Sequence, residues 1–267
     1  MKSRSAYLLR RCVLTIALLW SALLSFAQVG EHRNDFAVGA NAGFVLSNVG
    51  FTPSVSQTMH SGITLGATFR YTCEKYFKTI CSIVAEVNYA TVGWKEDILD
   101  AMDQPVVNAV TGKAEEYQRH LHYVQVPVFA HLAWGKERKG WQFFAQAGPQ
   151  FGFLLSESTT TNFDLATADI SQRSNKIVAQ DTMKVQNRFD YGIAAGAGAE
   201  LVLPKAGHFL LEARYYYGLG NIYHDSKRDY FGKSNMGNIV VKLTWLFDLK
   251  KRNKQKRMPA IDIPLTE

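Results

Sequence analysis

The sequence predicts an all-β fold, an eight-stranded antiparallel up-and-down transmembrane β-barrel. Apolar and polar residues alternate with a period of two over segments of about nine residues, which is the length that a tilted strand needs to cross a bilayer. The connections between these segments alternate between long and short, as they do in outer-membrane barrels. An export signal precedes the first segment.

Residues 1–27 have the organisation of a secretory signal peptide. Four basic residues precede an apolar run at residues 12–24, and Ser25, Phe26 and Ala27 form a small-x-small cleavage site. The run is too short to span a membrane as a helix. We therefore expect residues 28–249 to form the barrel and residues 250–267 to follow it as a basic periplasmic tail.

The predicted strands follow one another with apolar side chains on one face and polar or small ones on the other. The apolar faces of the first four begin at Phe36, Ile63, Ile83 and Val124. Those of the last four begin at Trp141, Phe189, Phe209 and Ile239. Most of these segments are longer than the five or six residues usual for strands of soluble proteins. Their apolar faces are therefore expected to meet lipid.

The lengths of the connections are sorted by position. Long connections are predicted around residues 45–60, 94–118, 156–187 and 221–236. Short turns are predicted at residues 74–79, 135–140 and 204–207. A soluble sandwich has no reason to place all its long loops at one end, so the pattern favours an outer-membrane barrel over a secreted soluble barrel.

Three tryptophans predict an interfacial aromatic girdle. Trp134 and Trp141 flank a charged turn at the ends of two adjacent apolar faces, and Trp245 lies on the last apolar face. Burial of these indoles in a soluble core is the alternative.

Charge is nearly balanced outside the two ends of the chain. Residues 28–249 contain 20 basic and 21 acidic side chains, so no nucleic-acid-binding surface is expected. Outer-membrane lipid and lipopolysaccharide are the expected partners. The tail carries six cations that we expect to bind anionic headgroups or an acidic periplasmic partner, a disordered solubilising tail being the alternative: Lys250, Lys251, Arg252, Lys254, Lys256 and Arg257.

Charged and polar residues of the inward parity predict an ionic network inside the barrel. They are Arg70, Glu86, His131, Asp190, Glu200, Glu212, Arg214 and Lys242. An eight-stranded barrel is just wide enough to be filled by side chains, and buried charges must be paired there. Arg70 and Arg214 are the expected hubs, since a guanidinium binds several carboxylates. The network is either a static polar plug or a gated ion path; a wide porin would need 16 or more strands.

Cys73 and Cys81 flank the turn after the second predicted strand and share one parity. A disulfide can join the ends of two paired strands in an oxidising periplasm, and two free thiols are the alternative.

No metal site or cofactor is expected. His120 and His122 have a spacing that suits a metal, but no third ligand lies close in sequence. In the second long connection, Glu96, Asp97, Asp100 and Asp103 have the spacing of one side of a short helix. Such a face either bridges divalent cations to lipopolysaccharide phosphates or to a partner, or is merely solvated.

Four motifs resemble the PorT-like outer-membrane β-barrel family. They are Tyr123-Val-Gln-Val-Pro-Val128, Ala147-Gly-Pro-Gln-Phe-Gly-Phe-Leu154, Phe189-Asp-Tyr-Gly-Ile-Ala-Ala-Gly-Ala-Gly198 and Arg214-Tyr-Tyr-Tyr-Gly-Leu-Gly-Asn-Ile222. The resemblance implies an eight-stranded barrel in the outer membrane of a Gram-negative bacterium that uses type IX secretion. The basic tail is not part of the shared pattern.

The resemblance and the residues together predict a non-enzymatic barrel with a structural or assembly role. An accessory part in type IX protein secretion, with a periplasmic partner from the secretion machinery, is the first expectation. A small-solute channel or a surface-adhesion barrel that acts through its long loops is the alternative. A lipid-modifying enzyme would need Ser, His and a carboxylate to converge on the lipid-facing surface, and spacing alone shows no such cluster.

Overall fold

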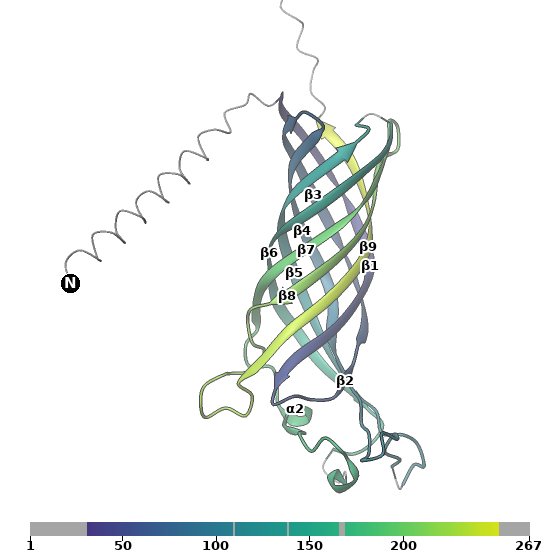
Figure 1. The fold of residues 1–267 in the computed structure, drawn as a ribbon, viewed down its shortest axis with the longest axis vertical. Helices are drawn as coiled ribbons and strands as arrows, with labels where there is room; N and C mark the ends of the chain where they lie inside the picture. Colours follow the sequence, from purple (N-terminus) through teal and green to yellow (C-terminus); the bar gives the residue numbers. More distant parts are fainter. Residues whose placement is uncertain (1–30, 109, 138, 166–168, 251–267) are drawn as a thin grey trace, which may run out of the picture.

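The structure is a computed structural model, and it describes residues 31–250 except residues 109, 138 and 166–168. Eight long strands run along the barrel (Figure 1): β1 (Glu31–Thr52), β3 (His60–Tyr76), β4 (Thr79–Glu96), β5 (Tyr117–Gly135), β6 (Gly140–Thr161), β7 (Phe189–Leu203), β8 (Gly207–Gly218) and β9 (Lys233–Lys250). Three short elements lie between them: β2 (Gln57–Thr58), η1 (Ile170–Gln172) and α2 (Ala179–Thr182).

The eight long strands form a closed antiparallel ring. Each pairs with its neighbours along the chain, β1 pairs with β9, and β2 adds two residues alongside the end of β4. The predicted eight-stranded up-and-down barrel is therefore confirmed. Because the ring is closed, none of the long strands has an unpaired edge.

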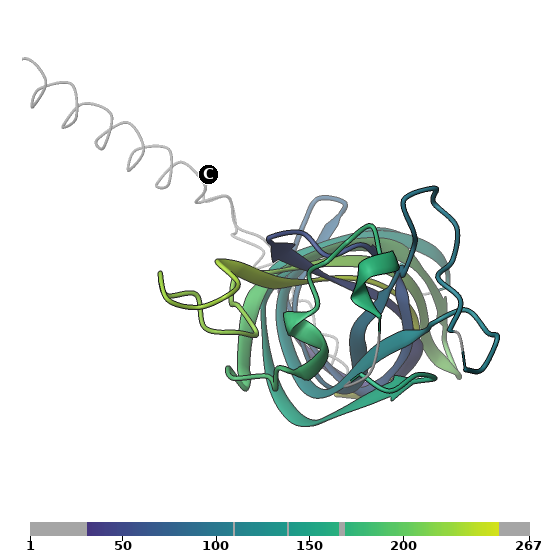
Figure 2. The ribbon, with the colours of Figure 1, turned by 90° about the horizontal axis from the view of Figure 1, so that it is seen from below.

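Two groups of connections define the ends of the barrel. We call the end with the connections 77–78, 136–139 and 204–206 the turn end, and the end with residues 53–59, 97–116, 162–188 and 219–232 the loop end. Seen from the loop end, the segment that carries η1 and α2 passes in front of the barrel mouth (Figure 2). The predicted sorting of short and long connections is therefore present.

Several strands extend farther toward the loop end than the sequence predicted. β1 and β6 each have 22 residues, so the first long connection is reduced to residues 53–59. The end of β6 is polar, yet it still pairs with β5, Tyr117 facing Thr161. The alternation of apolar and polar residues stops where lipid stops, whereas backbone pairing continues beyond it, so sequence periodicity underestimates strand length here.

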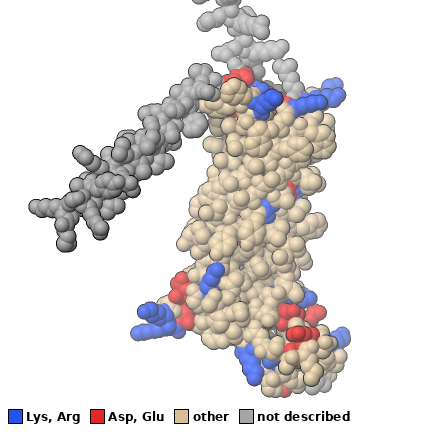
Figure 3. All heavy atoms as spheres, viewed as in Figure 1, with Lys and Arg blue, Asp and Glu red and all other residues tan. Residues whose placement is uncertain are grey.

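The outer surface carries a continuous apolar belt. Side chains of the predicted lipid-facing parity are exposed on all eight strands, with Phe44 at 72% and Phe143 at 66% as examples. Charged side chains gather at the two ends of the molecule, and the band between them has few (Figure 3). We take the strand residues within this belt as the membrane-spanning segments. The part of the chain that the structure describes has no helix with the length and hydropathy to cross a membrane.

Closure of the ring depends on a glycine between β1 and β9. A Cβ atom at Gly39 would lie 1.7 Å from the carbonyl oxygen of Trp245. No side chain fits at such a distance, so the inward-facing glycine lets the two strands approach each other in a narrow barrel.

The interior changes in character along the barrel axis. The loop end is filled by an apolar cluster that we call the loop-end core, which includes Trp94, Tyr117, Leu121, Tyr223 and Phe231. Charged side chains occupy the middle. A small apolar group that includes Phe144 and Leu246 lies toward the turn end.

Candidate functional site

The middle of the barrel holds two carboxylates and two cations in mutual contact. Arg214 donates from Nε to Glu212 at 2.7 Å and from Nη2 to both oxygens of Glu86 at 3.1 Å. Lys242 contacts Glu86 directly and lies 3.5 Å from Glu212. We call these four residues the ion-pair layer. All are at most 4% exposed, and their formal charges sum to zero, which is the condition under which buried charges are tolerated.

Neutral side chains complete the hydrogen bonding of this layer. Gln146 donates to Glu212 at 2.7 Å and accepts from His131 Nδ1 at 3.0 Å. Asn88 donates to Glu86 at 2.8 Å. The Arg214 guanidinium also lies over the Phe129 ring, 4.4 Å from its centroid. The carboxylates of the layer are thus held by several donors.

A second ionic group lies nearer the turn end. Arg70 Nη1 is 2.9 Å from both oxygens of Glu200, and His208 Nδ1 bonds the same carboxylate at 2.5 Å. His208 Nε2 is 3.2 Å from Asp248. Arg70 and Arg214 thus each bind carboxylates, but in separate groups.

Of the eight predicted interior residues, Asp190 joins neither group. It accepts a 2.7 Å hydrogen bond from the Tyr216 hydroxyl on the neighbouring strand. His131 joins the ion-pair layer only through Gln146. Sequence reasoning missed His208 because the predicted strand began at Phe209. Its even number matches Glu212 and Arg214 on β8, and that parity was the available signal.

A cavity of about 560 Å³ opens beside the second ionic group, and its lining includes Arg70, Glu200, His208 and Asp248. His131 also lines it, and its Nε2 atom has no hydrogen-bond partner among the described residues. The lining of the cavity does not include the four residues of the ion-pair layer, which are buried farther along the barrel axis.

The loop end is closed by packing as well as by covering loops. Phe51 contacts Trp94 edge-on with ring centroids 5.4 Å apart, and Phe231 stacks on Tyr223 at 5.5 Å. Residues from the loops 162–188 and 219–232 thus complete a core that begins on the strands.

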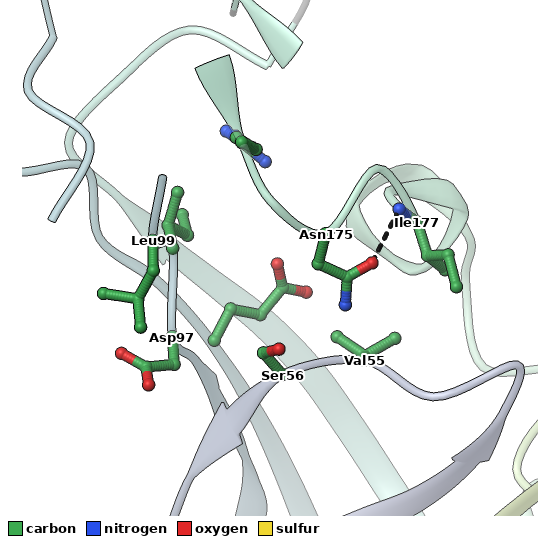
Figure 4. Close-up of a pocket in the computed structure, with 9 residues that line it drawn as sticks. Val55, Ser56, Asp97, Leu99, Asn175 and Ile177 are labelled. Carbon is green, nitrogen blue, oxygen red and sulfur yellow. Dashed lines mark hydrogen bonds between the residues drawn. The ribbon is translucent and has the colours of Figure 1, made fainter. Parts of the chain in front are cut away.

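A small pocket remains between three of the loop-end connections (Figure 4). Val55 and Ser56, Asp97 and Leu99, and Asn175 and Ile177 line it from different segments. Its volume of about 10 Å³ is room for one water molecule, so it is a packing gap between loops rather than a ligand site.

Two buried carboxyl groups meet beside this pocket. Glu96 accepts from Gln180 at 2.9 Å and lies within hydrogen-bonding reach of Asp181, whose other neighbour is Arg173 at 3.7 Å. Burial is the main cause that raises the pKa of both carboxyl groups, and for Glu96 the charge of Asp181 adds to it. Asp181 Oδ1 has no hydrogen-bond donor among the described residues, and a proton on Glu96 would supply one.

The predicted acidic helix after Glu96 is wrong. Residues 97–103 contain no helix; Asp100 instead accepts hydrogen bonds from the backbone N–H groups of Met102 and Gln104 and so closes a turn. Aspartate favours such turns over helix interiors. Glu96 is turned inward, so the four carboxylates do not share a face.

His120 and His122 lie on the outer side of β5 and take different partners. His120 is 2.8 Å from His60 Nε2, and His122 is 2.7 Å from the Tyr89 hydroxyl. Among the described residues, no group of three or more His, Cys, Asp or Glu side chains is placed to hold a metal ion.

The remaining predicted residues lie at the turn end. Cys73 and Cys81 are free thiols in the structure. Their disulfide in an oxidising periplasm stays a prediction. Trp134, Trp141 and Trp245 are 40%, 60% and 44% exposed in the belt, and Trp245 Nε1 donates to the Ala206 carbonyl at 2.7 Å. Of the tail cations, Lys250 ends β9, and the other five lie outside the described residues.

The chain is similar to several solved outer-membrane proteins at low sequence identity. Ail, the attachment invasion locus protein of Yersinia pestis, is 12% identical over 81% of this chain and 99% of its own, with a TM-score of 0.33. OprG from Pseudomonas aeruginosa is 15% identical over 82% and 98%, with a TM-score of 0.36. AlkL, solved in lipid bilayers, is 12% identical over 85% and 96%, with a TM-score of 0.32.

The comparison at the level of sequence families is more direct. No curated protein matches the sequence. Residues 26–224, most of the chain, match the family described as outer membrane protein beta-barrel domain. The chain therefore belongs to this family of outer-membrane β-barrels and is an integral outer-membrane protein.

Proposed function

We propose that this protein is a non-enzymatic outer-membrane barrel with a structural or assembly role, acting through its two ends. The observation that carries the proposal is the double closure of the lumen, by the ion-pair layer and by the loop-end core. A barrel closed at two levels suits an anchor better than a conduit. In this family short turns face the periplasm and long loops face outward, so the cavity near His208 opens toward the periplasm.

Within that role, we propose an accessory part in type IX protein secretion. The motifs between Tyr123 and Ile222 that resemble the PorT-like family support this assignment. The basic tail that begins at Lys250 would then provide contact with a periplasmic partner.

Deletion of the protein tests this role. Export of type IX cargo should fall, with lipid composition unchanged, and a chain that ends at Leu249 should fail to restore it if the tail is the contact. The matched control is the full-length chain expressed at the same level. Normal cargo export after deletion would reject the secretion role.

The alternative of a surface-adhesion barrel is favoured by one feature of the second long loop. Met102 and Val110 are 82% and 93% exposed at its outer part, so these apolar side chains do not stabilise the fold by burial. Substituting both with serine should abolish attachment if the loop binds a surface, and should leave cargo export intact.

A channel is tested by conductance in planar bilayers, where we expect none above the level of empty membranes.

A further inference from the structure

The edge of the belt nearest the loop end, which we call the rim, combines exposed aromatic side chains with two cations over β7, β8 and β9. Phe189 and Tyr191 on β7, Tyr217 on β8 and Leu219 just after β8 are each between 43% and 50% exposed. They belong to the edge of the belt nearest the loop end, because the next residues toward that end are polar. Large apolar side chains in this position lie beside the acyl chains and headgroups of the outer leaflet.

The first cation is Arg188, which directly precedes this aromatic edge. It is exposed, and its Nη2 atom donates to the carbonyl oxygen of Leu155 on β6 at 3.1 Å. That bond uses one of the five N–H donors of a guanidinium. The side chain is therefore held at the level of the rim with donors left for a ligand.

The second cation is Lys233, at the start of β9. Its ammonium group lies 5.9 Å from the centroid of the Tyr217 ring, which draws it toward the belt. Among the described residues neither Lys233 nor Arg188 forms an ion pair with a carboxylate.

One asparagine is bonded to the chain neighbours of both cations. Asn221 accepts from the Asn187 side chain through its carbonyl oxygen and from the Ser234 N–H through its side chain, both at 2.8 Å. The chain neighbours of Arg188 and Lys233 are thus bonded to the same residue. Asp225 accepts from Asn221 Nδ2 at 2.9 Å, so this carboxylate is bonded to the asparagine and not to either cation.

We propose that Arg188 and Lys233 form a binding site for a phosphorylated glycolipid of the outer leaflet, of the lipid A type. Its phosphates would lie against the two cations and its acyl chains along the exposed side chains of Phe189, Tyr191 and Tyr217. Charge complementarity favours this occupant over a neutral lipid, and the adjoining apolar edge favours it over a free anion. The site rests on the outer-membrane location of the barrel and not on its proposed role.

Native mass spectrometry of the full-length barrel in neutral detergent tests the site with bisphosphorylated lipid A as the probe. The double substitution Arg188→Gln and Lys233→Gln should weaken retention of this lipid by about tenfold or more. Both side chains are exposed, so the variant should fold, as its heat-modifiable migration in gels will show. The matched control is Lys227→Gln with Arg228→Gln, which removes two exposed cations from the loop 219–232, just before Lys233.

Four outcomes decide the proposal. Loss of lipid A from the rim variant, with retention by the loop-tip control, supports the site. Equal loss from both variants would show a general effect of net charge and overturn it. Equal binding of lipid A without phosphates would show that the cations play no part. Displacement of lipid A by millimolar inorganic phosphate would show a free-anion site instead.

Discussion

The middle of the barrel and its loop end are both closed, but by different interactions. In the middle, Glu86, Glu212, Arg214 and Lys242 neutralise one another in a section surrounded by lipid. At the loop end, aromatic and aliphatic side chains fill the section, and loops supply part of them. The difference follows from the solvent outside. Where lipid covers the outer face, apolar residues are needed outward, and the inward parity is left for polar groups. Beyond the membrane the strands can turn apolar side chains inward, as in a water-soluble protein.

This difference predicts unequal tolerance to single substitutions. Arg214→Met leaves two buried carboxylates with Lys242 as their only cation. We expect a loss of about 3–5 kcal/mol in the free energy of unfolding, since removing one member of a buried ion pair leaves uncompensated charge. Urea unfolding in lipid vesicles measures it. Arg228→Met, at the exposed loop tip, should change stability by no more than about 0.5 kcal/mol. A loss below about 1 kcal/mol for Arg214→Met would mean that the layer is hydrated.

A truncation in the loop-end core should have a smaller and more local effect. Leu121→Ala removes a fully buried side chain, and we expect a cost of about 2–3 kcal/mol. Because the loops can relax into the space, the loss should appear as faster hydrogen exchange of loop-end amides, with exchange in the membrane-spanning segments unchanged. Val110→Ala, at a 93% exposed site, is the control. Equal acceleration in both regions would show that the two regions unfold together.

The two regions were also unequally predictable. Parity alone indicated which charges point inward, because strands alternate and the outer face had to be apolar. It did not indicate partners: Arg214 meets Glu86 from a distance of 128 residues in the chain, a contact that depends on the stagger of strands around the ring. His208 was missed only because the predicted strand began at Phe209, two residues after the start of β8.

The part of the loop-end core that the loops supply had no periodic signal to find. Tyr223 and Phe231 lie in an irregular connection, and their burial depends on loops folding back over the mouth. Asp100 misled in the opposite direction, because its spacing to Glu96 is helical while its side chain closes a turn. Periodicity indicates only regular elements, so it could predict the belt and the inward charges but not the structure of the loops.

The smallest expected effect is a pH dependence confined to the loop end. The pKa of Glu96, whose ordinary value is 4.5, is raised by burial and by the neighbouring Asp181, whose own pKa is also raised. Above pH 4.5 the unfolded glutamate has lost its proton while the folded one retains it, so the folded state binds more protons and stability falls as the pH rises through this window. Arg173 and Arg119, which face Asp181, limit the effect.

Hydrogen exchange of residues 170–185, compared between about pH 5 and about pH 9 after correction for intrinsic rates, measures this dependence. Protection should decrease toward high pH in the unmodified chain. Glu96→Gln, which cannot ionise, should keep the hydrogen bond to Gln180 and lose most of the pH dependence. Protection that rises with pH, or a dependence that survives in Glu96→Gln, would show that the carboxyl pair does not control the loop end. Closure there would then rest on apolar packing and on the other polar contacts of the loops, such as the buried ion pair of Arg173 with Glu115.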